Sequence, residues 1–495
     1  MLIDRQRTDR TLLLFFGIVL LSIAVRVITA EYVDIGGDNS EKWRQVFNLL
    51  EGTGYTHWYQ QTVRWGILLP LAGLMKAFGH NPVLMYVQPI LYSSLAAGLI
   101  FLIGQRLQGR ALGVTAALAT ILFPQMAQTG SQLWPGVFEL FHICLCIWLI
   151  LLWLDSRSTP VLVLAALCFF LGWGCRVTMV YAAPGLALLM YLPTRRFRPV
   201  LLFFGLFAVL CVVEWAAFRY ISGFPMGRLG IISATHLKTA GLGISLGEYL
   251  LNIKAIVKYK GLMAVWALCL AAGVHNAFDR DARWRALGLL YCIHVFLLLY
   301  MVSSLSPLKL AMPVGVRFWG VSAPVGLLLL LRSLSVVGIA RPRTAKALTA
   351  VLFLAFIAFS VKKIPPVNSL MQVNRDYHLL SPLLMQDKPI LLEYEHWQPN
   401  FIEEYVISVF TGKKGKRIPT RDEAHMAIRR SHWRMVPLFV TDLDKQEAFY
   451  ADDNVHYLSD TVALFVPPGV DPDTPPAAEI KFGRKLQKAL PIQTN

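Results

Sequence analysis

The chain has 495 residues, of which 56% are hydrophobic, and carries a formal net charge of +17 at pH 7. Its mean hydropathy of +0.52 excludes an ordinary soluble globular protein and indicates a protein that crosses a membrane several times. Residues 362–495 hold 17 basic and 17 acidic side chains, so the whole positive excess lies in residues 1–361. A basic excess confined to apolar segments reflects loop orientation and anionic lipid, which argues against nucleic-acid binding.

The first apolar run, 11–30, is long enough to cross a bilayer and lacks a small-residue cleavage site after it. We therefore expect a retained span, and further stretches of the same character follow it. The eleven expected spans are 11–30, 82–104, 111–126, 136–154, 159–174, 177–193, 199–220, 261–277, 286–305, 313–331 and 345–361.

The arginine-rich loops predict the orientation. With a cytoplasmic N-terminus, the loops GQRLQGR, LDSRS, PTRRFRP, FDRDARWR and RSLSVVGIARPRTAK all lie inside. This orientation requires that the short apolar stretch 65–79, which contains Pro70 and Lys76, does not cross the membrane. We therefore expect 65–79 to be a juxtamembrane helix of the outer loop 31–81, with the C-terminus on the outer side.

The outer loop begins with carboxylates placed directly against the membrane exit, in DIGGDNSEKW. Gly36 and Gly37 permit a tight turn that places Asp38 at the start of a helix running from about Ser40. A carboxylate at this position has two interpretations. It acts as a general base for a hydroxyl or amine nucleophile, or it caps a helix and keeps the loop soluble.

The composition changes after residue 361, where KKIPPVNS is typical of a linker. Alternating strand and helix patterns then predict a small extracytoplasmic α/β domain over 362–495, distinct from a membrane domain over 1–361. The expected strands are 389–395, 416–420, 435–442 and 461–467, and the expected helices are 400–412 and 420–430.

All seven cysteines lie in or beside apolar segments, so neither a disulfide framework nor a cysteine-based zinc site is indicated. No phosphate-binding glycine loop, nucleophile elbow or zinc-binding helix motif occurs in a usable context. This argues against nucleotide-driven and hydrolase chemistry.

Several weak motifs occur in a telling order. An acidic residue follows span one, an arginine leads the juxtamembrane helix, and the turn GQRLQGR closes the second span. The segments FPQMAQTGSQLWPGVFELF and LGWGCRVTMVYAAPGLALL come next. Together, over roughly residues 1–330, they resemble the GT-C glycosyltransferases, specifically the bacterial protein-mannosyltransferase-like and lipid A aminoarabinose transferase-like members. The resemblance implies an α-helical polytopic membrane enzyme that takes a sugar from a polyprenyl-phosphate donor.

In this family an acidic residue of the first outer loop acts as the base or orients the acceptor, and Asp38 is the best match. Many relatives carry an acidic pair at this point, whereas this chain reads Asp38–Asn39. The second carboxylate is therefore missing or displaced to Glu41 or Asp34. The resemblance leaves open both the identity of the base and whether a divalent metal is held.

The leaving lipid phosphate gains negative charge in the transition state, so the chemistry requires cations at its oxygens. Arg64 matches the loop arginine of the family and Arg176 its "TR" segment, while Lys309 and Arg317 flank the turn into the tenth span. Arg317 is followed by Phe318 where relatives carry tyrosine. The alternative for each cation is snorkelling to lipid headgroups.

Three residues are candidates for holding the acceptor or a sugar. Glu139 lies one turn into the fourth span, where a carboxylate either binds a hydroxyl or pairs with a cation such as Arg176. His57 and Trp58 present rings to the C–H face of a sugar, or anchor the loop at the interface.

The sequence thus predicts a glycosyltransferase of the plasma membrane with an extracytoplasmic catalytic face. Its donor is a polyprenyl-phosphate sugar, and its acceptor is a lipid, glycan or protein. Two alternatives stay open: a transporter or flippase of a lipid-linked sugar, and a ligase or polymerase of preassembled glycans. Transporters usually carry charges at the membrane midplane, whereas the charges here gather at span ends.

Overall fold

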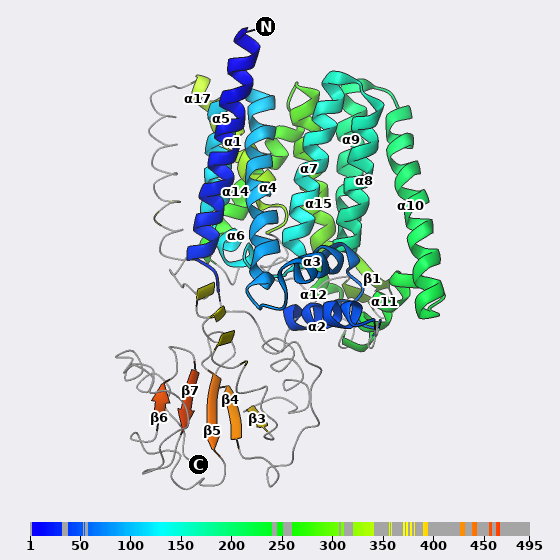
Figure 1. Cartoon of the computed structure of the whole chain (residues 1–495). Coiled ribbons are helices and arrows are strands. Elements are labelled where there is room, and N and C mark those ends of the chain that lie inside the picture. Colours follow the sequence, from blue (N-terminus) through cyan, green and yellow to red (C-terminus); the bar gives the residue numbers. More distant parts are fainter. Residues whose placement is uncertain are drawn as a thin grey trace. The chain divides into compact units, whose positions relative to one another are not determined.

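A computed structural model describes residues 2–31, 38–52, 54, 58–239, 245–250, 260–305, 308–310 and 320–340. It also describes isolated positions between 356 and 381 and five strands between 390 and 465. The chain divides into two compact units (Figure 1). The helical unit comprises 1–29, 57–67 and 88–366, and the loop unit comprises 30–56, 68–87 and 367–495.

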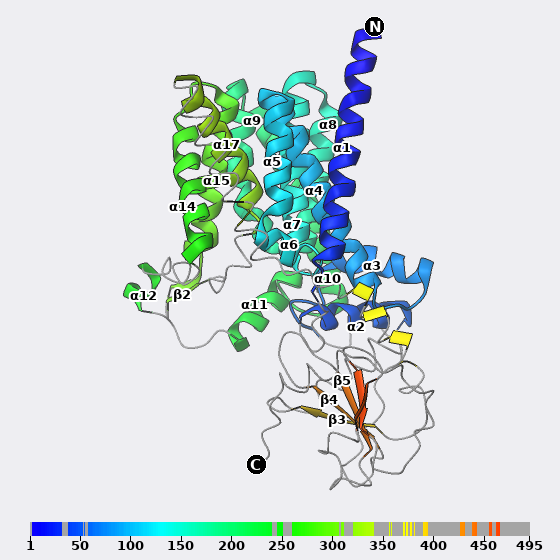
Figure 2. The same ribbon diagram turned by 90° about the vertical axis from the view of Figure 1, so that its left-hand side faces the viewer.

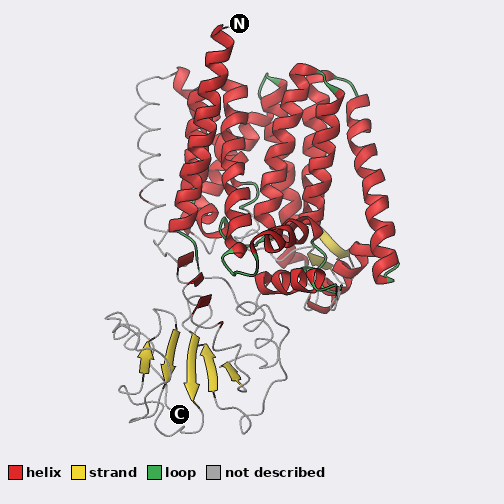
Figure 3. Ribbon diagram, viewed as in Figure 1, coloured by secondary structure: helices red, strands yellow, loops and turns green. Residues whose placement is uncertain are grey.

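The described part of the helical unit is a bundle of long helices joined by short turns (Figure 3). Its main helices are α1 Leu2–Ile28, α4 Leu84–Gln108, α5 Arg110–Leu122, α7 Pro135–Ser156, α8 Thr159–Cys175, α9 Ala183–Thr194, α10 Arg198–Ser222, α14 Lys260–Ala277, α15 Ala282–Tyr300 and α17 Ala323–Ala340. Shorter elements complete it: α6 Pro124–Thr129, η1 Val177–Ala182, α11 Gly227–Thr239, α12 Leu246–Leu250, β1 Val302–Leu305 and β2 Leu308–Leu310.

The outer surface of this bundle is apolar. In α10, Leu201, Val209 and Val212 each expose at least 60% of their surface. Such a face is unfavourable in water and suits lipid, because transferring apolar surface out of water lowers the free energy. Six described helices are long and apolar enough to cross a membrane: Asp9–Ile28, Leu84–Gln108, Pro135–Ser156, Val177–Thr194, Arg198–Ser222 and Ala282–Tyr300.

Glycines allow the inner helices to approach closely. α14, α15 and α17 lie side by side (Figures 1 and 2). A Cβ on Gly288 of α15 would lie 2.5 Å from the backbone nitrogen of Ala277, and one on Gly185 of α9 would lie 2.5 Å from the Cα of Leu290. These contacts are shorter than packed side chains permit, so the glycines set the interhelical distances.

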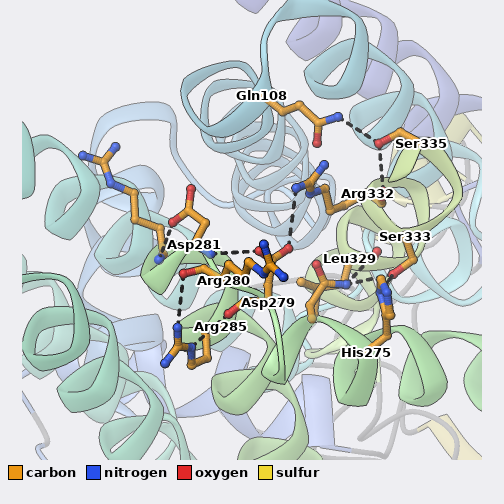
Figure 4. A network of polar contacts seen from close by, with 12 residues as sticks. Gln108, His275, Asp279, Arg280, Asp281, Arg285, Leu329, Arg332, Ser333 and Ser335 are labelled. Carbon is orange, nitrogen blue, oxygen red and sulfur yellow. Dashed lines mark hydrogen bonds and ion pairs between the residues drawn. The ribbon is translucent and has the colours of Figure 1, made fainter. Parts of the chain in front are cut away.

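Polar contacts join the helices at the end where α4 terminates (Figure 4). The buried Asn276 donates from Nδ2 to Leu329 O and Ser333 Oγ, and Gln108 Nε2 donates to Ser335 Oγ at 2.8 Å. The turn between α14 and α15 is held by an ion pair of Asp279 with Arg332. These contacts fix α4, α14 and α17 at this end of the bundle.

The expected spans from 11–30 to 261–277 each coincide with described helices. The prediction for 286–305 was wrong at its end, because α15 stops at Tyr300 and 302–305 forms β1, paired antiparallel with β2. Ser303 and Ser304 have low helix propensity, because their hydroxyls compete for backbone hydrogen bonds. Residues 311–319 and nearly all of 345–361 lie outside the described residues, so the number of spans stays a prediction.

The loop unit brings the first outer loop together with the C-terminal region. α2 Asp38–Leu50 and α3 Trp65–Phe78 are both helices, as expected, and α2 begins at Asp38. The ring of His80 lies 5.3 Å from that of Trp43 and 4.7 Å from that of Phe47. Tyr377 Oη donates to His80 O at 2.9 Å, so a residue of the C-terminal region contacts the loop directly.

The C-terminal region contains a mixed five-stranded sheet in the order β3-β4-β5-β7-β6. The strands are β3 Ile390–Tyr394, β4 Met426–Arg430, β5 Leu438–Asp442, β6 Val455–Tyr457 and β7 Val462–Phe465. Three expected strands match β3, β5 and β7. The helix expected over 420–430 was wrong at 426–430, because pairing on both sides makes this segment strand β4. Residues 400–412 and 416–420 lie outside the described residues.

We predict that Gly288→Ala destabilises the protein by about 1–3 kcal/mol, because the added methyl group overlaps the backbone of α14. The matched control is Gly205→Ala in α10, where nothing lies within 4 Å of the new Cβ. That variant should keep or slightly raise stability through helix propensity. Thermal unfolding in detergent measures both, and equal melting temperatures would contradict the packing argument.

The buried position of His80 leads us to predict that the stability of the protein depends on pH. Burial lowers the pKa of His80 to about 4. Between about pH 6.5 and about pH 4, the histidine is protonated in the unfolded chain but neutral in the folded chain. The free energy of unfolding therefore decreases as the pH falls through this window. We expect His80→Phe to melt with a smaller difference between pH 7 and pH 5 than the wild type. An unchanged difference would remove His80 as the cause.

Candidate active site

A buried ion pair lies where α7 begins and α8 ends. Glu139, on the first turns of α7, is completely buried, and Arg176 is the C-cap residue of α8. Glu139 Oε2 lies 2.7 Å from Arg176 Nη1, and Thr178 Oγ1 donates to Glu139 Oε1, also at 2.7 Å. Both carboxylate oxygens are thus engaged. The structure brings together two residues that the sequence suggested for different roles, and makes Glu139 the counter-ion of Arg176.

A second buried carboxylate, Glu214 of α10, joins three other segments. Its Oε1 accepts from Trp65 Nε1 at 2.5 Å and lies 2.8 Å from Arg228 Nε of α11, while its Oε2 accepts from Trp173 Nε1 of α8 at 2.6 Å. Arg219 is the cation nearest to Glu214 in the sequence, but it lies over the ring of Trp215 at 5.3 Å.

Arg228 is held by contacts with Trp173 as well as with Glu214. Its guanidinium lies 5.0 Å from the ring centroid of Trp173, and its Nη2 donates to Trp173 O at 2.8 Å. Burial lowers the pKa of Arg228, and the Glu214 carboxylate opposes that shift. Because an arginine pKa starts far above neutrality, the side chain remains a cation at physiological pH. The cluster is therefore a fixed buried ion pair framed by two indoles.

The Glu214 cluster also positions Arg64, which directly precedes α3. Trp65 packs so tightly on α8 that a Cβ on Gly174 would overlap its ring, and a Cβ on Gly66 would lie 2.8 Å from Cys175 N. Arg64 itself is half-buried and donates from Nε to Gln60 O at 3.2 Å. Cys175 directly precedes Arg176 in the chain. Arg64 is thus brought into the region of the two buried ion pairs.

Asp38 and Glu41 share the first turn of α2 in the loop unit. Asp38 is half-buried, and Glu41 is 5% exposed. Lys42 Nζ donates to the backbone oxygen of Asp38 at 2.8 Å. Within the described part of the chain, the Asp38 carboxylate itself accepts no hydrogen bond. A carboxylate at a helix N-terminus interacts favourably with the helix dipole and keeps its lone pairs available here.

Of the remaining predicted site residues, only Trp58 has its side chain within the described part of the chain. Trp58 is half-buried. Lys309 lies on β2, paired opposite Ser304, and its side chain lies outside the described residues, as do His57 and Arg317. Over the residues that the structure describes, no group of three or more His, Cys, Asp or Glu side chains gathers to hold a metal ion.

Sequence reasoning missed the cluster of Glu214 with Trp65, Trp173 and Arg228. A glutamate toward the end of an otherwise apolar span was the available signal, since an ionisable side chain in a span calls for a partner. The partner could not be chosen from spacing, because Arg219 is near in sequence and Arg228 belongs to another helix.

A family model described as dolichyl-phosphate-mannose-protein mannosyltransferase matches residues 67–217. The matched range includes Glu139, Arg176 and Glu214, and Arg64 precedes it by three residues. No curated protein matches the chain.

Two solved structures are similar to this chain. The ArnT protein of Cupriavidus metallidurans bound to undecaprenyl phosphate is 12% identical over 85% of this chain and 93% of that one, with a TM-score of 0.52. An Archaeoglobus fulgidus oligosaccharyltransferase in complex with Zn and sulfate is 13% identical over 80% of this chain, with a TM-score of 0.46. This chain spans 61% of the length of that archaeal protein. The resemblance to GT-C proteins and the class of α-helical multi-pass membrane protein are confirmed at the level of the fold. The number of spans, the orientation and the extracytoplasmic C-terminal domain stay predictions.

We predict that Glu214→Gln destabilises the protein by about 3–5 kcal/mol, because it leaves the charge of Arg228 buried without a counter-ion. Combining it with Arg228→Met should restore much of the loss, since neither charge then remains. Arg219→Gln, at an exposed position of the same helix, is the control and should change stability by less than about 0.5 kcal/mol. Thermal unfolding in detergent tests this, and a double variant as unstable as Glu214→Gln would refute it.

Proposed function

We propose that this protein is a glycosyltransferase that moves a sugar from a polyprenyl-phosphate donor to a lipid, glycan or protein acceptor at the outer face of the plasma membrane. The GT-C fold and the mannosyltransferase family match support transfer from a lipid-linked donor. The observation that carries the proposal is Asp38. It opens a helix of the first outer loop, where GT-C enzymes use an acid, and its carboxylate is not engaged by described neighbours.

In the proposed reaction the Asp38 carboxylate takes the proton of the acceptor hydroxyl or amine. The acceptor atom forms a bond to the anomeric carbon as the bond from that carbon to the phosphate oxygen breaks. The configuration at the anomeric carbon inverts, and polyprenyl phosphate leaves with the bonding electron pair. Glu41, one turn further along α2, is the second acid of this pair and orients Asp38 or the acceptor.

Cations stabilise the departing phosphate, because its negative charge grows in the transition state. Arg64 is the first of these, since the Trp65–Glu214 hydrogen bond fixes the segment that carries it. Arg176 is the second, oriented by Glu139. Lys309 and Arg317 remain proposals from the sequence. Glu139 serves here through Arg176, because both of its oxygens are already bonded.

The acceptor and the sugar ring meet the first outer loop and the C-terminal region in this proposal. His57 and Trp58 stack on the sugar. The contact of Tyr377 with His80 supports a C-terminal region that shapes the loop carrying Asp38. A divalent ion is not needed for the displacement as written, and the chemistry leaves room for one beside Asp38.

The position of the buried charges favours an enzyme over a transporter. Glu139, Arg176, Glu214 and Arg228 lie at helix ends on the side where α8 and α10 terminate. A transporter of lipid-linked sugar is expected to carry its binding charges near the midplane, at broken helices. The pairs seen here suit a catalytic face at one membrane surface.

The test uses the full chain purified in detergent with radiolabelled undecaprenyl-phosphate sugars and a crude acceptor extract. We expect Asp38→Asn to release undecaprenyl phosphate about 10²–10⁴-fold more slowly than wild type, because the general base is lost. Glu51→Gln, an exposed carboxylate just after the same helix, is the control and should keep the wild-type rate. Equal rates for Asp38→Asn and wild type, at equal melting temperature, would remove Asp38 from the base role.

A further inference from the structure

Arg26 is a buried cation without a counter-ion. It lies in the last turn of α1 and is completely buried. Its Nη1 donates to Ile121 O at 3.0 Å, and within the described part of the chain its Nε and Nη2 have no partner. No carboxylate of the described residues lies within ion-pair distance of it.

Two other arginines among the described residues are buried, and both have a counter-ion. Arg176 pairs with Glu139, and Arg228 pairs with Glu214. A buried guanidinium without an anion is strongly unfavourable, because the cost of removing its charge from water is not offset by attraction to a negative charge. The dipole of α5, which ends at Leu122 beside the Arg26 contact, supplies only about half an elementary charge. The guanidinium of Arg26 therefore has no full negative charge beside it among the described residues.

The chain is shaped to hold Arg26 in place. A Cβ on Gly130 would lie 2.6 Å from Arg26 Nε, so only glycine leaves room for the guanidinium. Gly130 is fixed in turn, because its carbonyl accepts from Ser93 Oγ at 2.9 Å and its N–H donates to Met126 O. The side chain is thus seated between the ends of α5 and α6 rather than extended to the membrane surface.

Further polar groups in these same segments are buried without partners among the described residues. Ser22 Oγ lies one helical turn before Arg26 on α1, and Ser131 Oγ follows Gly130. Both amide atoms of Gln125, on α6, are unpartnered as well. Buried polar groups normally bond to protein or to ordered water. Water would satisfy the hydroxyls and the amide, but it would not neutralise the guanidinium.

We infer that Arg26, with Gln125 and Ser131, forms a binding site for a phosphate oxyanion, apart from the arginines assigned to the transferase reaction. A guanidinium offers two parallel N–H donors that match the oxygens of a phosphate, and neighbouring hydroxyl and amide donors suit its remaining oxygens. A phosphate bound at this site would be the counter-ion that Arg26 lacks. It stands without the transferase proposal, since it depends on the polar groups around α1 alone.

The test measures the rise in melting temperature of the purified full chain on adding undecaprenyl phosphate, phosphatidylglycerol or inorganic phosphate. Wild type should be stabilised by at least one probe, because a ligand of the native state raises its melting temperature. In Arg26→Met the apparent affinity should fall by about tenfold or more, as the charge-assisted hydrogen bonds are lost. The probe that acts tells an isoprenoid phosphate from a lipid headgroup or the free ion.

A second readout is independent of added ligand. Arg26→Met without any phosphate should melt at the same temperature as wild type or higher, since it removes an uncompensated buried charge. Gln125→Leu keeps the charge and should weaken the same probe severalfold, which covers the case in which Arg26→Met does not fold. Arg106→Gln, at an exposed ion pair with Asp155, is the control and should bind as wild type.

Two results would overturn the inference. One is a probe response that is equal in wild type, Arg26→Met and Gln125→Leu. The other is the absence of any response of wild type to all three probes. Failure of the transferase proposal looks different, because Asp38→Asn would then release lipid phosphate at the wild-type rate while binding through Arg26 persists.

Discussion

One end of the helical unit, where α8 and α10 terminate, depends on one constraint: a charge inside an apolar bundle must be paired. Glu214 shows this most fully. Its two oxygens engage Trp65, Trp173 and Arg228, and so hold α3, α8 and α11 on α10. The pair stabilises little in isolation, because desolvation offsets much of the attraction. Its value lies in geometry, since both oxygens of Glu214 are bonded only where these four segments meet.

Aromatic contacts join described parts of the loop unit. Trp43, Phe47 and His80 pack together, and Tyr377 reaches them from the C-terminal region. Such contacts are individually modest, of about 0.5–1.5 kcal/mol for an aromatic pair. Several of them together connect the first outer loop to the C-terminal region within this unit.

Hydropathy and arginine counts predicted most of the described long helices, because lipid imposes length and composition on every span. They failed at 302–305, where a short hairpin replaces the end of a span, and at 332–340, where α17 continues through an expected loop. The helix expected at 426–430 is a strand, because strands pair with this segment on both sides. The site was only partly predictable. The pairing of Glu139 with Arg176 was one of two alternatives that the sequence left open, and helix contacts decide between them. The partner of Glu214 is Arg228 of another helix, although Arg219 is nearer in the sequence.

The engagement of each acid separates reactive from structural carboxylates. Glu139 and Glu214 have every oxygen bonded, so accepting a proton from a substrate would first require breaking a buried ion pair. Asp38 carries no such cost, because its described neighbours bond to its backbone and not to its carboxylate. A general base needs a lone pair within reach of the substrate and a charge that the protein does not already use. By that criterion the two buried glutamates hold the arginines in place, and we propose that the proton transfer falls to Asp38.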